Sequence, residues 1–200
     1  MKKFILPIVA VMAVAIAGCN ESEKLAKDLN GTWQGVPETL GNKVLTESSV
    51  TETFTFVHQE GTPGGTIQIN SEIAQQRAAS ADASLEAPFT VTVSATSTIS
   101  GSWEAVDDDE IRISLNPESF LLRVDPEAVA LTANPFSQYP VANVDSMKQS
   151  MIEFLTADLT GQMKAHYQMY NQIDEADLKD KGTRLKLEAG KLEFLLKKVQ

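Results

Sequence analysis

Residues 89–99 read FTVTVSATSTI and alternate between apolar and hydroxyl-bearing side chains along most of their length. A period of two is the pattern of a β-strand with one buried and one exposed face. The many β-branched residues favour the same structure, because they pack well on a pleated surface. The apolar face comprises Phe89, Val91, Val93, Ala95 and Ile99. This stretch therefore predicts a strand whose apolar face lies on a hydrophobic core.

The same alternation recurs on both sides of this strand. Residues 60–65, EGTPGG, cannot lie in a central strand, so they predict a hairpin turn, and Asp107–Asp109 predict a second one. Ala189-Gly190 joins the two strands of a C-terminal hairpin. The further strands that we expect lie at residues 50–56, 67–69, 102–106, 111–115, 185–187 and 192–196, with 120–124 and 129–131 forming one bent strand around Pro126.

Two stretches break the alternation. Ala74–Ala87 is rich in Ala, Ser and Gln and predicts an exposed insertion. Ala133–Asn143 predicts an irregular connection, in which Phe136 and Tyr139 lie beside prolines. Long loops are often functional, so we take Phe136 and Tyr139 as candidate contacts for a ligand or partner.

From residue 144 the period becomes that of a helix, and Asp145 can cap its start. Its apolar stripe comprises Val144, Met147, Met151, Phe154, Leu155, Leu159, Met163, Tyr167 and Tyr170. With roughly eight to ten strands, an open sheet would leave exposed edges. The predicted fold is therefore mostly β: a closed or nearly closed antiparallel β-barrel with one amphipathic helix before the C-terminal hairpin.

The N-terminus has the pattern of an export signal. Lys2 and Lys3 precede an uncharged run at residues 4–17, which would rise only about 21 Å as a helix and is short for a bilayer core of about 30 Å. Ile16-Ala17-Gly18-Cys19 resembles the lipobox of bacterial lipoproteins, which implies cleavage before Cys19 and fatty acylation of its thiol. We accordingly assign 1–18 to a signal peptide, 19–30 to the lipidated cysteine and a tether, and 31–200 to the barrel domain.

Composition narrows the partners. Cleavage would remove Lys2 and Lys3, two of the 17 basic side chains. The cleaved chain would then carry 15 basic and 27 acidic side chains, a formal charge of −12. A nucleic-acid partner is not expected, because the chain lacks a basic stripe to contact phosphates. Cys19 is the sole cysteine, which excludes an internal disulfide and multi-cysteine metal sites.

At Asn30-Gly31-Thr32-Trp33 a short possible helix meets a Gly-x-Trp strand start, which resembles the opening motif of lipocalins. Together with the lipobox, the chain resembles the lipocalin-like, calycin-type lipoproteins of the Bacteroidota. The resemblance implies that Trp33 closes one barrel end, with Arg184 or Lys186 against its ring. We therefore take Trp33, with Phe136 and Tyr139, as a candidate contact for a ligand or partner. Gly101-Ser102-Trp103 repeats the form and is either a second strand start or chance.

Candidate chemistry is sparse. His58, at a strand end, and His166, beside the helix stripe, lie in no catalytic spacing and are expected at the surface or its boundary. Asp107-Asp108-Asp109-Glu110 lacks the spacing that wraps calcium and predicts a solvated turn. We expect no catalytic residues, metal or cofactor.

The expected function is noncatalytic binding of an apolar small molecule or an envelope protein by an outer-membrane lipoprotein. Two alternatives stay open: an accessory or inhibitory lipoprotein with a filled barrel, and a hydrolase with an unrecognised carboxylate site. Asn20–Glu23 partly resembles a surface-export signal, so the periplasmic and surface faces of the membrane both remain possible.

Overall fold

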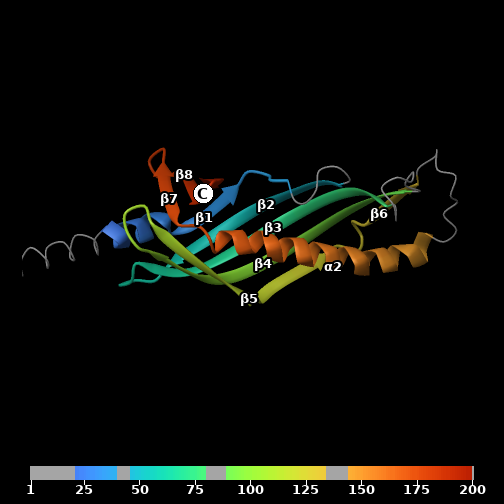
Figure 1. Ribbon diagram of the computed structural model, residues 1–200, viewed down its shortest axis with the longest axis horizontal. Coiled ribbons are helices and arrows are strands. Elements are labelled where there is room, and N and C mark those ends of the chain that lie inside the picture. Colours follow the sequence, from blue (N-terminus) through green and yellow to red (C-terminus); the bar gives the residue numbers. More distant parts are fainter. Residues whose placement is uncertain (1–20, 40–45, 80–88, 134–143, 200) are drawn as a thin grey trace, which may run out of the picture.

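The computed structural model describes residues 21–39, 46–79, 89–133 and 144–199. These residues form one large antiparallel sheet and a long helix (Figure 1). The elements are β1 (Gly31–Gly35), β2 (Thr46–His58), β3 (Gly64–Ala79), β4 (Phe89–Ala105), β5 (Ile111–Val124), β6 (Ala130–Ala133), α2 (Val144–Tyr170), β7 (Glu175–Lys179), β8 (Arg184–Ala189) and β9 (Leu192–Lys198). The mostly β character and the helix before the C-terminal hairpin are thus confirmed.

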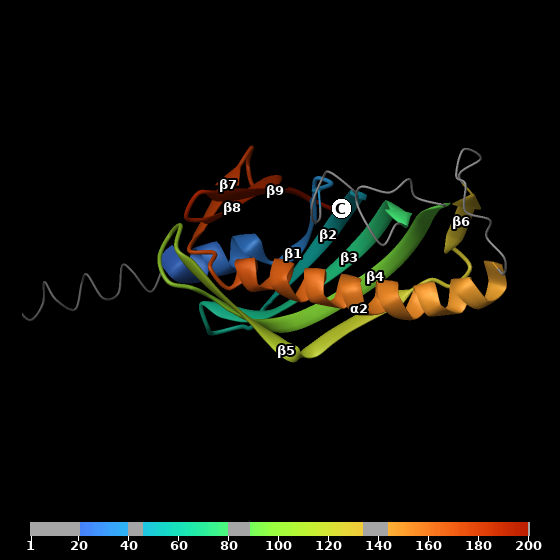
Figure 2. The same ribbon diagram turned by 45° about the vertical axis from the view of Figure 1, so that its right-hand side comes forward.

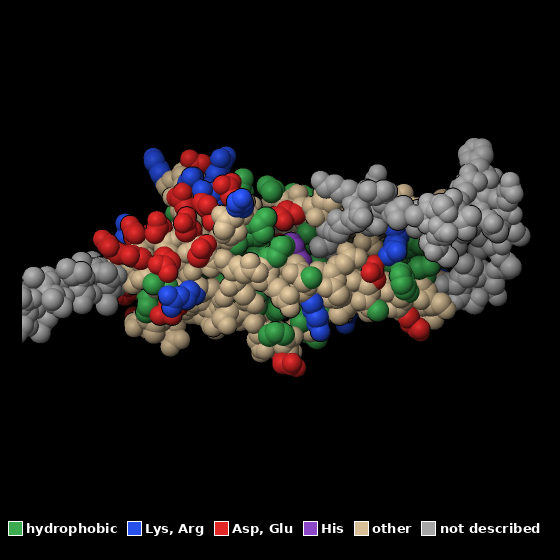
Figure 3. Space-filling view, in the orientation of Figure 1, with side chains coloured by type: hydrophobic (Ala, Val, Ile, Leu, Met, Phe, Trp, Pro, Cys, Tyr) green, Lys and Arg blue, Asp and Glu red, His purple; other side chains and the backbone are tan. Residues whose placement is uncertain are grey.

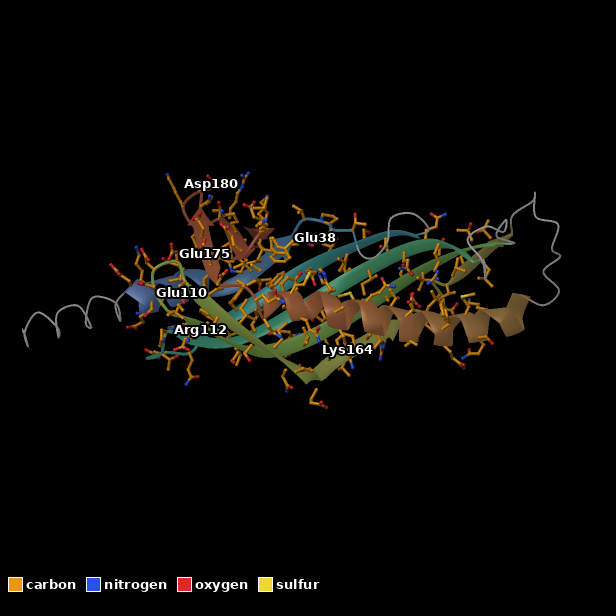
Figure 4. The ribbon with its side chains drawn as sticks, in the orientation of Figure 1. Glu38, Glu110, Arg112, Lys164, Glu175 and Asp180 are labelled. Carbon is orange, nitrogen blue, oxygen red and sulfur yellow. The ribbon has the colours of Figure 1, made fainter. Side chains whose placement is uncertain are left out.

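The strand order is β5-β4-β3-β2-β1-β9-β8-β7, with β6 paired to β4. No ladder joins the edge strands β5 and β7 within the described residues. A single isolated bridge, between Glu110 and Glu175, connects them at one end (Figure 4). There the Ile111 amide donates to the Asp174 carbonyl at 3.0 Å, and the Ala176 amide donates to the Asp109 carbonyl at 2.7 Å. The closed barrel of the sequence prediction is therefore not confirmed.

The helix α2 lies against the inner face of the sheet (Figure 2). Its ring contacts are edge-on: Tyr170 meets Phe54 of β2 with a centroid distance of 5.2 Å and Phe194 of β9 at 4.9 Å. The helix residues that are fully buried against the sheet are Leu155, Leu159, Met163, Tyr167 and Tyr170. The predicted stripe is confirmed at these positions but wrong at Phe154, whose side chain is 51% exposed.

Residues 21–29 form a short helix that packs on the sheet. Leu25, Ala26 and Leu29 are buried in the core, so the fold includes part of the segment expected to be a tether. The Trp33 indole donates to the Leu29 carbonyl at 2.8 Å, and this bond joins the short helix to β1. Neither of the two helices within the described residues is long and apolar enough to span a membrane.

The basic residue against Trp33 is Lys198 of β9, whose Nζ lies 4.8 Å from the ring centroid. The expectation of Arg184 or Lys186 is wrong: Arg184 pairs with Asp180, and Lys186 pairs with Glu188. Lys198 has the right position because β9 lies directly beside β1 in the sheet.

Strand lengths differ from the predictions in three places. Residues 74–79 are not an exposed insertion but the end of β3, where 74–77 pair with β2 and 74–79 pair with β4. The stretches 89–99 and 102–105 belong to one strand, β4, so Gly101-Ser102-Trp103 is not a strand start. Residues 111–124 likewise form one strand, β5, and β6 pairs with β4 instead of continuing β5.

Substituting Gly101 tests how closely β4 packs against β5. A Cβ on Gly101 would lie 2.2 Å from the Ser114 carbonyl oxygen of β5, so Gly101→Ala should lower the free energy of unfolding by about 1–3 kcal/mol. Gly161 in α2 has open space at the same position, and Gly161→Ala should raise stability by about 0.5–1 kcal/mol. Urea unfolding measures both, and equal effects of the two substitutions would contradict this packing.

Candidate functional site

A network of buried polar side chains lies between the sheet and the C-terminal half of α2. Glu52 of β2 faces Ser71 of β3 across the sheet, and both side chains are buried on the inner face. His166, Tyr167 and Tyr170 face them from α2, because positions three and four apart share one side of a helix. Residues from three elements thus meet in the core.

The carboxylate of Glu52 accepts three hydrogen bonds. Ser71 Oγ donates to its Oε1 at 2.9 Å, and the Tyr170 hydroxyl donates to its Oε2. His166 Nε2 lies 3.1 Å from the same Oε2 and 2.9 Å from the Tyr170 oxygen. Because the Tyr170 proton goes to Glu52, both oxygens near Nε2 are acceptors. The geometry therefore places a proton on His166 Nε2.

Tyr167 extends this network into the sheet. Its hydroxyl oxygen lies 2.7 Å from Ser71 Oγ and 2.8 Å from Ser97 Oγ of β4. Since Ser71 donates to Glu52, Tyr167 must donate to Ser71 and accept from Ser97. Burial raises the pKa of Tyr167 to about 12, against the opposing effect of the two serine hydrogen bonds. The hydroxyl therefore stays protonated and the donor chain intact at neutral pH.

Two charged groups influence His166. Burial, the largest effect, lowers its pKa, but the hydrogen bond to Glu52 and the charges of Glu52 and Glu38 outweigh burial and hold the pKa above 6.5. Glu38 is half-buried in the segment after β1 (Figure 4). Burial raises the pKa of Glu38 above 4.5, opposed by His166 and reinforced by Glu52.

This arrangement is suited to hold a proton and to fix the position of α2. Neutral His166 with its proton on Nε2 already completes the hydrogen bonds to Glu52 and Tyr170. A second proton, on Nδ1, adds positive charge beside two carboxylates, so it strengthens the attachment of the helix. Within the described ranges no group of three or more His, Cys, Asp or Glu side chains is placed to hold a metal ion.

The expectation that His166 lies at the surface or boundary is wrong, because its side chain is 8% exposed and partnered. One signal in the sequence points to this site: Glu52 occupies the apolar face shared by Val50, Phe54 and Phe56. A carboxylate at such a position needs a buried partner. His58 is half-exposed at the end of β2, as predicted, with Nε2 2.9 Å from the Thr62 carbonyl.

The other predicted contact residues lie elsewhere. Trp33 is buried under the short helix and pairs with Phe54 of β2, and its contact with a ligand or partner stays a prediction. Cys19, Phe136 and Tyr139 lie outside the described residues. Asp107–Asp109 form the predicted turn at the end of the sheet near residue 21, where acidic side chains gather (Figure 3).

Comparisons with known proteins add no relative. No family model matches the chain, and no curated protein or solved structure matches it significantly.

The network predicts that stability falls with rising pH. Because folding raises the pKa of His166, its contribution is complete below pH 6.5 and is lost as the pH rises through the raised value. The free energy of urea unfolding, measured from about pH 6 to about pH 9, should decline in the wild type. His166→Gln should flatten the decline, and His58→Gln, outside the network, should preserve it. Parallel profiles for the wild type and His166→Gln would refute this assignment.

Proposed function

We propose that this chain is a lipid-anchored protein of the cell envelope that binds an apolar small molecule noncatalytically, between its sheet and α2. The anchor is Cys19, by its resemblance to the lipobox cysteine of bacterial lipoproteins. Two or more acyl chains hold a protein stably on a membrane, since each buried methylene contributes about 0.8 kcal/mol. The lipocalin-like barrel belongs to the same proposal, supported by the Glu110–Glu175 bridge between the sheet edges.

The uneven attachment of α2 carries the proposal. Its C-terminal half is buried and held by the Glu52 network. In its N-terminal half Phe154 is exposed, with the Arg77 guanidinium of β3 over its ring. Near the middle of the helix, Asp158 makes a part-exposed ion pair with the same arginine at 2.8 Å. A helix fixed at one end can lift at the other and admit a guest to the apolar face beneath. The N-terminal end of α2 and the short helix at residues 21–29 lie at opposite ends of the molecule, so this end of α2 is far from the proposed anchor (Figure 1).

An interaction protein with a filled interior is the second candidate. One observation favours it: Leu159, Met163 and Tyr167 already pack into the core beneath α2. A partner would then use the outer surface, where β2, β3 and β4 and the corner at Arg123–Pro126 line a pocket of about 870 Å³.

The anchor is tested by labelling. The full chain, expressed in a bacterium that processes lipoproteins and fed an alkyne-tagged palmitate, should carry the label and sediment with membranes. Cys19→Ala should abolish the label, because it removes the thiol that is acylated. A labelled Cys19→Ala chain would place the modification elsewhere.

Binding is tested on the same full chain. Native mass spectrometry of the protein extracted from its membranes should show an added apolar mass that disappears on denaturation. The filled-interior alternative instead predicts a bare chain that crosslinks to an envelope protein. A bare chain without a crosslinked partner would contradict both candidates.

A further inference from the structure

The side-chain amide of Gln75 is buried and has no hydrogen-bond partner among the described residues. Gln75 is 2% exposed on the inner face of β3, between Ile73 and Arg77. Within that part of the chain, neither its Nε2 nor its Oε1 is hydrogen-bonded. Such an orphaned group costs about 1–3 kcal/mol, and nearly all buried polar groups in native proteins are paired. Among the described residues, the amide is therefore free to bind a further partner.

A second orphan lies along the same contact between β3 and α2. Gln162 Nε2 donates to Asp158 Oδ2 at 3.0 Å, but Gln162 Oε1 is buried without a hydrogen-bond partner in the described part of the chain. Asp158 Oδ2 also accepts from Arg77 Nη1 at 2.8 Å. Gln75 precedes Arg77 by two residues, and Gln162 follows Asp158 by one helical turn. The two amides thus flank one ion pair between β3 and the middle of α2.

We propose that Gln75 binds the polar group of the guest, and that this group is a carboxamide or another amide with a free N–H. A primary amide presents a donor and an acceptor side by side, so a second amide can pair with both. With α2 in its observed position Arg77 is paired with Asp158, so Arg77 offers no unpaired cation for a charged head group beside Gln75. This inference rests on the proposed function, since it names the ligand class of the same site.

The neighbours of Gln75 indicate an apolar body for the guest. Gln75 pairs with Val93 on β4, and Ile73 and Val91 are buried on the same face. Leu155 and Leu159 are buried on the facing side of α2. Lifting α2 from its N-terminus as far as Asp158 would break the part-exposed Arg77–Asp158 pair and leave the Glu52 network intact. The guest can therefore enter without displacing the whole helix.

The experiment compares two probes on the full chain in phospholipid nanodiscs. Decanamide carries the proposed polar group, and methyl decanoate has a chain of the same length without an N–H donor. Equilibrium dialysis against empty nanodiscs measures the binding due to the protein. Gln75→Leu keeps the size of the side chain and removes the amide, and Gln76→Leu is the matched control on the exposed face.

Decanamide should bind the wild type and Gln76→Leu at least tenfold more tightly than Gln75→Leu, and methyl decanoate should bind all three alike. Without probe, Gln75→Leu should unfold at a higher temperature than the wild type, because it removes an orphaned amide. Equal binding of decanamide by all three proteins would overturn the role of Gln75 and leave apolar binding standing. A lower unfolding temperature for Gln75→Leu would also overturn it, since the amide would then be paired. Failure of both probes with every protein would overturn the small-molecule function itself.

Discussion

The buried carboxylate of Glu52 constrains how the inner face of this sheet can be covered. A charge removed from water needs compensating donors, and here two of the three come from α2. Only a helix placed with His166 and Tyr170 over β2 supplies them. The same placement brings Tyr167 within hydrogen-bond distance of Ser71 and Ser97. One acidic residue in an apolar strand thus determines both the position and the rotation of the helix.

The network also divides α2 into two parts of unequal stability. Removing one partner of a buried charged pair typically costs about 3–5 kcal/mol, so the C-terminal half is expensive to detach. Aromatic contacts of Tyr170 with Phe54 and Phe194 add to that attachment. Beyond this network, the described polar contacts of α2 with β3 are the part-exposed Asp158–Arg77 ion pair and the Arg77 guanidinium over the Phe154 ring. Part-exposed ion pairs contribute about 0–1 kcal/mol. Local opening should therefore begin at Phe154 and end before His166.

Much of the sheet could be predicted from the sequence because alternation is a local property. The strands around Phe54, Ile69 and Val93 and the C-terminal hairpin were all correctly predicted. Strand ends were harder, because Gly101 lies inside β4 at a close approach to β5, where glycine usually signals a turn. The placement of β1 between β2 and β9 depends on contacts far apart in sequence, and no local pattern carries it.

The candidate site was harder to predict for the same reason. His166 has no unusual sequence neighbours, and its partner Glu52 is more than a hundred residues away. The only signal in the sequence was a glutamate on an apolar strand face. Such a residue indicates that a buried polar site exists, but it does not indicate which residue pairs with it. Nothing in the sequence indicated that Gln75 is buried, because residues 74–79 lack the large apolar side chains that mark a strand.

The edge strand β5 is protected from pairing with another chain, although no ladder joins it to β7 within the described residues. An unpaired edge is a template for another chain unless its amides are occupied. The Leu115 amide donates to Asn171 Oδ1 at 2.8 Å, the Ile111 amide donates to the Asp174 carbonyl, and Pro117 has no amide proton. The residues that follow α2 therefore protect the edge in place of a ladder. Because these contacts cluster at the fixed end of α2, the sheet can open at the opposite end without losing them.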